Sequence, residues 1–360
     1  VFVEKIDGNS WHFMSLPTGI AFSDDNFNFA NSAGVQDANH SGGTFTGPAL
    51  WSSDPEIYAQ PSGGNGSHLD MLHGSPYSMG IAHEADNVFW VYDDWNKDIV
   101  RYDFADDHGP GNDDHSDGKI HRYKGIGITA DGNIPNHLVL DKATGWLYFV
   151  DNGNDRVMRL DINSGTGMVN LPEINEPLEE HFRITGFTTE TIIDSGLEAP
   201  CGIEIFDGVL YVGDYATGDI VAYDMANDFA EITRIVTGEL GLTGIKIGPD
   251  GNLWFVNRAQ NTLNIATPGD ISSTSEVEGN LAIQMSPNPT ANVVTITVPS
   301  MDNYQEAMID VISLTGKVLI PAKPLQPSQT LDLANLPDGL YLLRINGNGN
   351  QQYEKIILQR

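Results

Sequence analysis

Short apolar runs recur along the chain up to about residue 267, and turns rich in Gly, Asp and Asn separate them. The clearest stretch, residues 136–161, predicts three short strands. Its second strand, 147–151, has counterparts that also end in Asp or Asn, namely at Asn31, Asp93, Asp214 and Asn257. An internal period of roughly 40 to 65 residues built from short strands is typical of a β-propeller with one blade per repeat.

A second apolar run precedes each of these strands, and we expect it to form the innermost strand of a blade. These runs cover residues 19–22, 80–83, 137–140, 202–205 and 244–247. We therefore predict an all-β propeller with five recognisable blades. A sixth is expected, either closed by the N-terminal strand or lost with a missing N-terminus.

The stretch from Asn136-His137-Leu138 to Val157 resembles an NHL repeat, a blade type found in six-bladed and related propellers. The resemblance covers residues 1–268 and implies an architecture rather than an activity. Ser, Thr, Glu and Gly then dominate residues 269–280, which predicts a linker.

Residues 281–360 alternate like strands and carry Pro287-Asn288-Pro289, a turn at Gly316-Lys317, and Gly339-Leu340-Tyr341. Together these motifs resemble the C-terminal sorting domain of the type IX secretion system of Bacteroidetes, a small antiparallel β-sandwich. One departure is Met285-Ser286, where that family usually has an aromatic residue. The resemblance implies that the secretion machinery recognises residues 281–360. It also implies passage through the periplasm, then release or attachment to the cell surface, commonly after cleavage in the linker.

Charge and cysteine content exclude several function classes. The formal net charge of −31 repels nucleic acid and anionic membrane surfaces, and it attracts divalent cations. A single cysteine excludes a disulfide within the chain and a thiolate-rich metal site. There is no apolar run of membrane-spanning length and no leader after Val1, so we expect a processed or truncated product without a membrane span.

Strand direction places a set of polar residues at the top of the predicted propeller, which is the face where the inner strands begin and the second strands end. These ligand candidates are Thr18, Asp93, Asn136, His137, Asp151, Cys201, Asp214 and Asn257. They could form a cup that binds a metal ion or a polar ligand. Alternatively, each Asp or Asn caps its own turn, and their repetition favours this interpretation. Packing roles are likewise favoured for His137 and for Cys201, which has no activating base nearby in the sequence.

Histidine-rich segments suggest two metal sites on opposite faces. The lower candidate combines imidazoles and carboxylates of His83, His108, Asp113, Asp114, His115 and Asp117. The upper candidate combines His68 and His73, expected in a loop before the second inner strand, with His137. Mixed ligands suit Zn²⁺ or Mn²⁺, whereas the Asp- and Gly-rich loop alone would suit Ca²⁺.

No nucleophile elbow, Ser/His/Asp order or phosphate-binding loop is present. The leading hypothesis is a secreted or cell-surface module that binds an unknown extracellular ligand or partner. The alternative is a metal-dependent hydrolase or lyase that uses the His and Asp loops. A third possibility is secretion cargo whose sorting domain is the functional element.

Overall fold

The computed structural model divides the chain into two compact units, one within residues 1–265 and one within residues 266–360. It describes residues 4–8, 14, 16–25, 27–33, 46–59, 66–174, 176–248, 251–266, 283–298, 307–313, 317–347 and 350–360. The predicted linker, residues 269–280, lies outside these ranges. Within them, no helix has the length and apolar character that a membrane crossing requires.

The repeat at residues 136–161 folds into three antiparallel strands, as its pattern predicts. These are β9 (Leu138–Asp141), β10 (Trp146–Asp151) and β11 (Arg156–Asp161). Gly145, with φ 75°, and Asp155, with φ 53°, take the left-handed backbone conformation that these tight turns require. The fourth strand of this sheet, β14 (Thr189–Ile193), arrives only after a long insertion.

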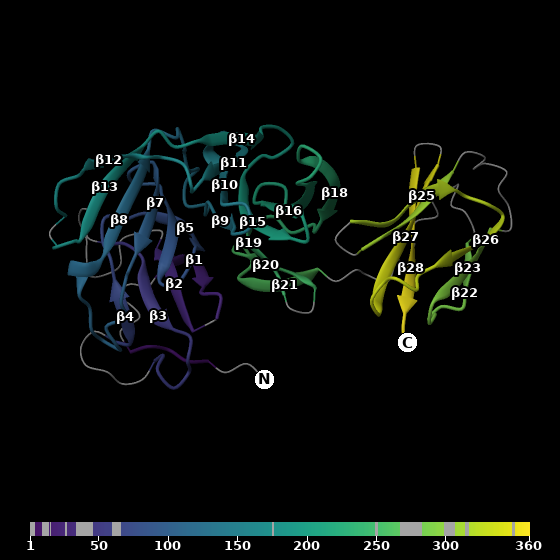
Figure 1. Ribbon diagram of the computed structural model, residues 1–360, viewed down its shortest axis with the longest axis horizontal. Coiled ribbons are helices and arrows are strands. Elements are labelled where there is room, and N and C mark those ends of the chain that lie inside the picture. The colour runs from purple at the N-terminus through teal and green to yellow at the C-terminus, as the bar shows by residue number, and fades with distance from the viewer. Residues whose placement is uncertain are drawn as a thin grey trace. The chain divides into compact units, whose positions relative to one another are not determined.

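The other repeats form four further sheets of this kind, which confirms the predicted all-β propeller (Figure 1). Their strands are β1 (Pro17–Phe22), β2 (Asn28–Ala33), β3 (Ala49–Ser52) and β4 (His68–Met71); β5 (Ser78–His83), β6 (Val88–Asp93), β7 (Asp98–Asp103) and β8 (Lys119–Lys124); β15 (Pro200–Phe206), β16 (Val209–Asp214), β17 (Asp219–Asp224) and β18 (Ala230–Val236); and β19 (Leu242–Ile247), β20 (Leu253–Asn257) and β21 (Thr262–Ala266). The expected sixth blade is not among the described residues.

Inner strands of successive blades lie side by side around a central channel. β1 contacts β5, β5 contacts β9, β9 contacts β15, and β15 contacts β19. The approach is so close that a Cβ atom on Gly80 would lie 2.1 Å from the carbonyl oxygen of Asn136, which explains a glycine at this place. Between blades, buried side chains such as Trp90 and Phe149 pack into shared clusters. Loss of such a ring typically costs about 3–5 kcal/mol.

The insertion after β11 extends the second blade rather than forming a free loop. Its strands β12 (Gly167–Asn170) and β13 (Glu180–Thr185) join the edge of β8, and β13 pairs with β8 in parallel. The second blade therefore becomes a six-stranded sheet. This pairing brings the β12–β13 connection, which contains Glu176, next to the loop between β7 and β8.

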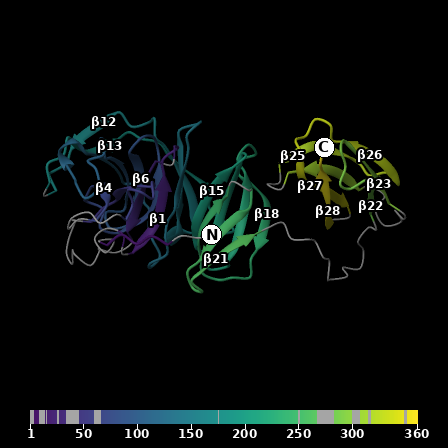
Figure 2. The ribbon, with the colours of Figure 1, turned by 90° about the horizontal axis from the view of Figure 1, so that it is seen from below.

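The second unit is the predicted antiparallel sandwich. One sheet contains β22 (Gln284–Ser286), β23 (Val293–Thr297) and β26 (Ser328–Asp332), and the other contains β24 (Met308–Ile312), β25 (Val318–Pro324), β27 (Gly339–Gly347) and β28 (Asn350–Leu358). The two sheets face each other in Figures 1 and 2. Val294, Ile309 and Leu343 belong to the buried cluster that both sheets share.

Candidate metal centre

The loop between β7 and β8 lies along the outer strand of the first blade. The backbone N–H of His108 donates to the carbonyl of Leu69 at 3.2 Å, and that of Gly111 donates to the carbonyl of His68 at 2.8 Å. The loop ends in a short 3-10 turn, η1 (His115–Asp117), which the side chain of Asp114 caps. A loop rich in His and Asp is therefore held against β4.

Asp70, His108 and Asp117 form a first group, which we term the aspartate site. The Nε2 atom of His108 lies 3.5 Å from Oδ2 of Asp117 and 4.0 Å from Oδ2 of Asp70. Ligands bound to one tetrahedral zinc ion at about 2.0–2.2 Å lie roughly 3.3–3.6 Å from one another. Both separations are long for direct hydrogen bonds, and the shorter one matches the spacing of ligands around one cation.

Asp70 is the residue of this site that water does not reach. Its side chain is wholly buried, and its Oδ1 accepts a hydrogen bond of 2.7 Å from the backbone N–H of Met71. Its Oδ2 has no hydrogen-bond partner among the described residues. Because burial outweighs the hydrogen bond from Met71, the pKa of Asp70 rises to about 8. A buried carboxylate oxygen without a partner is costly, and a bound cation would offset that cost.

The other two residues of the aspartate site reach solvent. The side chains of His108 and Asp117 are 20% and 31% exposed, against 0% for Asp70. A cation held by the three groups would therefore have protein on one side and water on the other. Three protein ligands with an open side leave coordination positions for water or for a ligand.

His73, His115 and Glu176 form a second group, the glutamate site. The Nδ1 atoms of both imidazoles face Oε2 of Glu176, and the His115 contact measures 2.9 Å. The side chains of His73 and Glu176 are each only 3% exposed. On the solvent side, Oδ2 of Asp113 lies 3.3 Å from Nε2 of His115. The carboxylate is thus shared between two imidazoles, one buried and one near the surface.

The pKa shifts in the glutamate site reflect this sharing. Burial opposes ionisation of Glu176, but hydrogen bonds from His115 and His73 hold its pKa below the ordinary value. Burial likewise opposes protonation of His115, but the hydrogen bond to Glu176 and the neighbouring carboxylates raise the pKa of His115 above the ordinary value.

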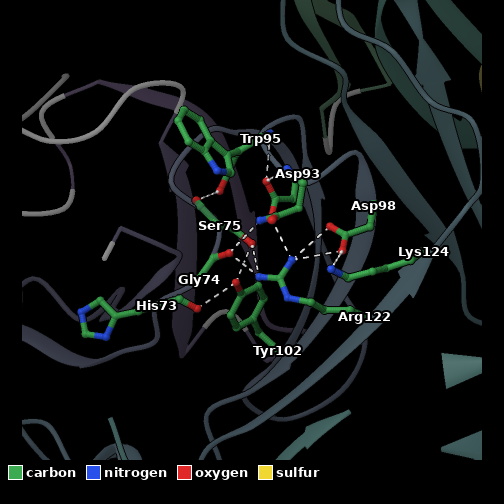
Figure 3. A network of polar contacts seen from close by, with 11 residues as sticks. His73, Gly74, Ser75, Asp93, Trp95, Asp98, Tyr102, Arg122 and Lys124 are labelled. Atoms are coloured by element: carbon green, nitrogen blue, oxygen red, sulfur yellow. Dashed lines mark hydrogen bonds and ion pairs between the residues drawn. The ribbon is translucent and has the colours of Figure 1, made fainter. Parts of the chain in front are cut away.

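A buried guanidinium stabilises the backbone beside these sites (Figure 3). The Nη1 atom of Arg122, in β8, donates to Asp93 at 3.0 Å and to Asp98 at 3.1 Å, and its Nη2 donates to the carbonyl of Gly74. Burial raises the pKa of Asp98 to about 7, although Arg122 opposes the shift. One cation thus serves two wholly buried carboxylates.

The same network positions His73. The Tyr102 hydroxyl donates to the backbone carbonyl of His73 at 3.1 Å and lies 2.6 Å from the hydroxyl of Ser75. Figure 3 shows the His73 ring pointing away from Arg122, on the far side of its own backbone. Gly74 has φ 98°, which a residue with a side chain rarely adopts. The main chain therefore fixes the direction in which His73 projects.

The prediction that the histidine groups lie on opposite faces is wrong. The rings of His73 and His115 meet with centroids 4.9 Å apart. His73 does lie in the loop before the second inner strand, but the loop between β7 and β8 runs along β4 and brings His115 to it. His68 instead packs against Trp51 with ring centroids 5.9 Å apart.

His83 and His137 belong to neither site, contrary to the predicted groupings. The Nδ1 atom of His83 accepts a hydrogen bond of 2.8 Å from Nζ of Lys142, and its Nε2 donates to the carbonyl of Asp86 at 2.9 Å. His137 lines the central channel, where its Nε2 donates to the carbonyl of Thr18 at 2.8 Å. Burial lowers the pKa of His137, which favours the neutral imidazole.

Three of the repeated residues, Asp93, Asp214 and Asn257, cap their own turns, which agrees with the favoured interpretation. Oδ1 of Asp93 accepts from two backbone N–H groups of its own turn at 3.0 and 3.1 Å, and Oδ1 of Asp214 does the same at 3.0 and 3.1 Å. Asn257 accepts from the backbone N–H of Gln260 in its own turn. Asp151 and Asn136 depart from this pattern, because they accept from the backbone N–H groups of Thr129 and Asn152 in other segments.

The predicted top-face cup is therefore not formed as a set. Asp93, Asn136, Asp151, Cys201 and Asp214 are all wholly buried. The Cys201 thiol donates to the carbonyl of Leu242 at 2.8 Å, and burial raises its pKa, so it is an inert buried thiol. Thr18, His137 and Asn257 line a cavity of about 690 Å³ at the upper end of the channel.

Asp70 and Glu176 were not identified as site residues from the sequence. Asp70 sits within the His-rich segment, and alternation along a strand would have placed it on the same face as His68. Glu176 lies within the insertion after β11, and no local pattern indicates that this segment returns to the second blade.

Comparison with known proteins supports the reading of the second unit. Residues 284–359 match the family described as "Secretion system C-terminal sorting domain". The chain therefore carries a type IX sorting domain and is exported, to be released or attached at the cell surface. No curated protein sequence matches the chain.

Several solved structures resemble the chain at low identity. A chain of a nidogen/laminin complex has a TM-score of 0.46 and 13% identity, covering 69% of this chain and 74% of that one. Glutaminyl cyclase of Myxococcus xanthus has a TM-score of 0.39 and 14% identity, with coverages of 74% and 97%. PorZ of Porphyromonas gingivalis, a surface component of the type IX secretion system, has a TM-score of 0.31 and 12% identity, with coverages of 95% and 59%.

Proposed function

We propose that the propeller is an exported binding module whose ligand site is built on a divalent cation held by Asp70, His108 and Asp117. The observation that carries this proposal is the wholly buried Asp70, whose Oδ2 lacks a hydrogen-bond partner in the described structure and faces His108. One imidazole with two carboxylates suits Zn²⁺ or Mn²⁺ better than Ca²⁺, which prefers oxygen ligands alone. The exposed side of the site leaves room for an oxygen or nitrogen atom of the ligand.

The test is the metal content of the full chain, measured by inductively coupled plasma mass spectrometry after loading with Zn²⁺ or Mn²⁺ and desalting. Asp70→Asn removes the buried ligand charge while keeping the shape of the side chain. Asp114→Asn is the matched control, because Asp114 caps η1 in the same centre and Asn caps equally well. We expect Asp70→Asn to lose a cation that the wild type and Asp114→Asn retain. Equal metal content in all three proteins would reject the aspartate site.

The open coordination positions also favour a second candidate, a metal-dependent hydrolase. A cation with three protein ligands can bind water and lower its pKa toward 7, which yields a nucleophile at neutral pH. The metal-loaded wild type and the Asp70→Asn variant would be compared on p-nitrophenyl esters and phosphates. Turnover that is lost in Asp70→Asn supports hydrolysis, whereas equal background rates for both proteins leave the binding module as the proposed function.

A further inference from the structure

We infer that His73, His115 and Glu176 hold a second divalent cation, so that the aspartate and glutamate sites form one two-cation centre at the junction of the first two blades. This inference rests on the proposed function, because it adds a neighbour to the cation at the aspartate site. The cofactor class is a divalent transition metal such as Zn²⁺, which the two imidazoles and one carboxylate suit.

Two short segments each contribute a residue to both sites. Asp70 and His73 lie at and just beyond the end of β4, and each contributes to a different site. His115 and Asp117 lie in η1 and are divided between the sites in the same way. Because each segment contributes to both groups, the sites are neighbours. A cation that fixes the conformation of a segment at one site therefore also fixes the residue that this segment contributes to the other site.

The charge of the centre calls for more than one cation. Asp70, Asp113, Asp117 and Glu176 contribute four carboxylates, and their ion pairs in the described structure are all with His73, His108 or His115. A bound cation requires ionised carboxylates and neutral imidazoles, and in that state the cluster carries about −4. A single divalent cation compensates half of that charge. A second divalent cation compensates the rest. Charges at buried positions such as Glu176 require this kind of pairing.

The side chains of the glutamate site lie close together, and the backbone at His73 is held in place by other residues. In each of His73, His115 and Glu176, one possible ligand atom lies within 4.8 Å of those of the other two. Tyr102 and Arg122 hold the main chain at His73 and Gly74, as described above. A Cβ atom on Gly74 would lie 2.9 Å from Nη2 of Arg122, so this support depends on glycine. Preorganised side chains of this kind lose little freedom when a cation binds.

The experiment is a stoichiometry measurement on the full chain, stripped with a chelator and titrated with Zn²⁺ by isothermal titration calorimetry. The variants are Asp70→Asn, His115→Ala and Glu176→Gln, with Asp114→Asn as the control. Circular dichroism confirms folding, and the part-exposed His115 is the position least able to disturb it. We expect two Zn²⁺ per wild-type and Asp114→Asn chain, and one per chain in each of the other three.

Each outcome separates the two claims. One Zn²⁺ per wild-type chain, lost in Asp70→Asn and kept in His115→Ala and Glu176→Gln, overturns the second cation and leaves the aspartate site intact. A single Zn²⁺ lost in His115→Ala and kept in Asp70→Asn overturns the aspartate site and with it the pair of cations. Absence of Zn²⁺ from every protein overturns both.

Discussion

The imidazole rings of His73 and His115 meet edge to face, with an interplanar angle of 85°. His73 follows the outer strand of the first blade, and His115 belongs to the loop between β7 and β8 of the second. Their shared partner Glu176 comes from the insertion that extends the second blade. The centre therefore lies where two blades and an insertion meet. It is not at the central channel, where the repeat pattern predicts the polar residues.

Asp70→Asn should stabilise the cation-free protein at neutral pH. Because burial raises the pKa of Asp70 to about 8, this carboxyl must take up a proton when the protein folds at neutral pH. Asn needs no proton, and its side-chain oxygen can still accept from the N–H of Met71. We expect the free energy of unfolding to rise by about 1–3 kcal/mol in chelator-treated samples. Urea denaturation measures it. Loss of stability in the variant would show that Asp70 serves packing rather than cation binding.

Asp98→Asn should change how stability depends on pH. Because the pKa of Asp98 is raised to about 7 in the folded protein, the native state binds this proton more tightly than the unfolded chain does. The contribution of Asp98 to stability is therefore present below about pH 4 and is lost as the pH rises toward 7. We expect the stability of the variant relative to wild type to increase across this window and to level off above it.

Urea denaturation at a series of pH values measures this difference. Asp219→Asn is the matched control, because Asp219 also opens the third strand of its blade, in β17, but lies nearer the surface, with its side chain 14% exposed. A difference between Asp98→Asn and wild type that stays constant with pH would contradict the prediction.

Arg122→Met should be strongly destabilising. It would remove the cation that pairs with two wholly buried carboxylates, Asp93 and Asp98, and the donor that holds the carbonyl of Gly74. Removal of one partner from such a buried network costs about 3–5 kcal/mol. Arg159→Met is the control, since Arg159 pairs with the part-exposed Glu190 and should cost only about 1 kcal/mol. Similar urea midpoints for the two variants would refute this account of Arg122.

Arg360→Ala should loosen the last strand of the sorting domain. The Arg360 guanidinium donates to the carbonyls of Leu333, Ala334 and Leu336 at 3.2, 3.0 and 2.9 Å. These bonds tie the end of β28 to the turn before β27, and their loss should cost about 1 kcal/mol. Amide hydrogen exchange in the full chain should quicken across residues 350–358 and remain unchanged in the propeller. Unchanged hydrogen exchange in β28 would show that the hydrogen bonds of Arg360 do not stabilise this strand.

The propeller and the sandwich could be predicted because their signals are local. Each blade repeats a short alternating strand that ends in Asp or Asn, and residues such as Asp93 and Asp214 recur because the same turn recurs. The glycine at the start of the inner strand, as at Gly80, recurs because inner strands approach closely.

The metal centre could be predicted only in part, because its geometry depends on non-local pairing. The sequence indicates His108, His115 and Asp117 as candidates, yet their partners come from β4, the residues just after it, and the β12–β13 connection. β4 is a four-residue strand at the edge of its sheet, and so short an alternating run is hard to distinguish from a loop in the sequence. Glu176 reaches the site only through the parallel pairing of β13 with β8, which leaves no periodic signal in the sequence.

The most direct test of the account is anomalous diffraction at the zinc absorption edge from crystals of the full chain grown with Zn²⁺. The account predicts an anomalous peak about 2.0–2.2 Å from Oδ2 of Asp70, Nε2 of His108 and a carboxylate oxygen of Asp117. Occupied zinc only at other surface histidines, with no peak beside Asp70, would contradict it.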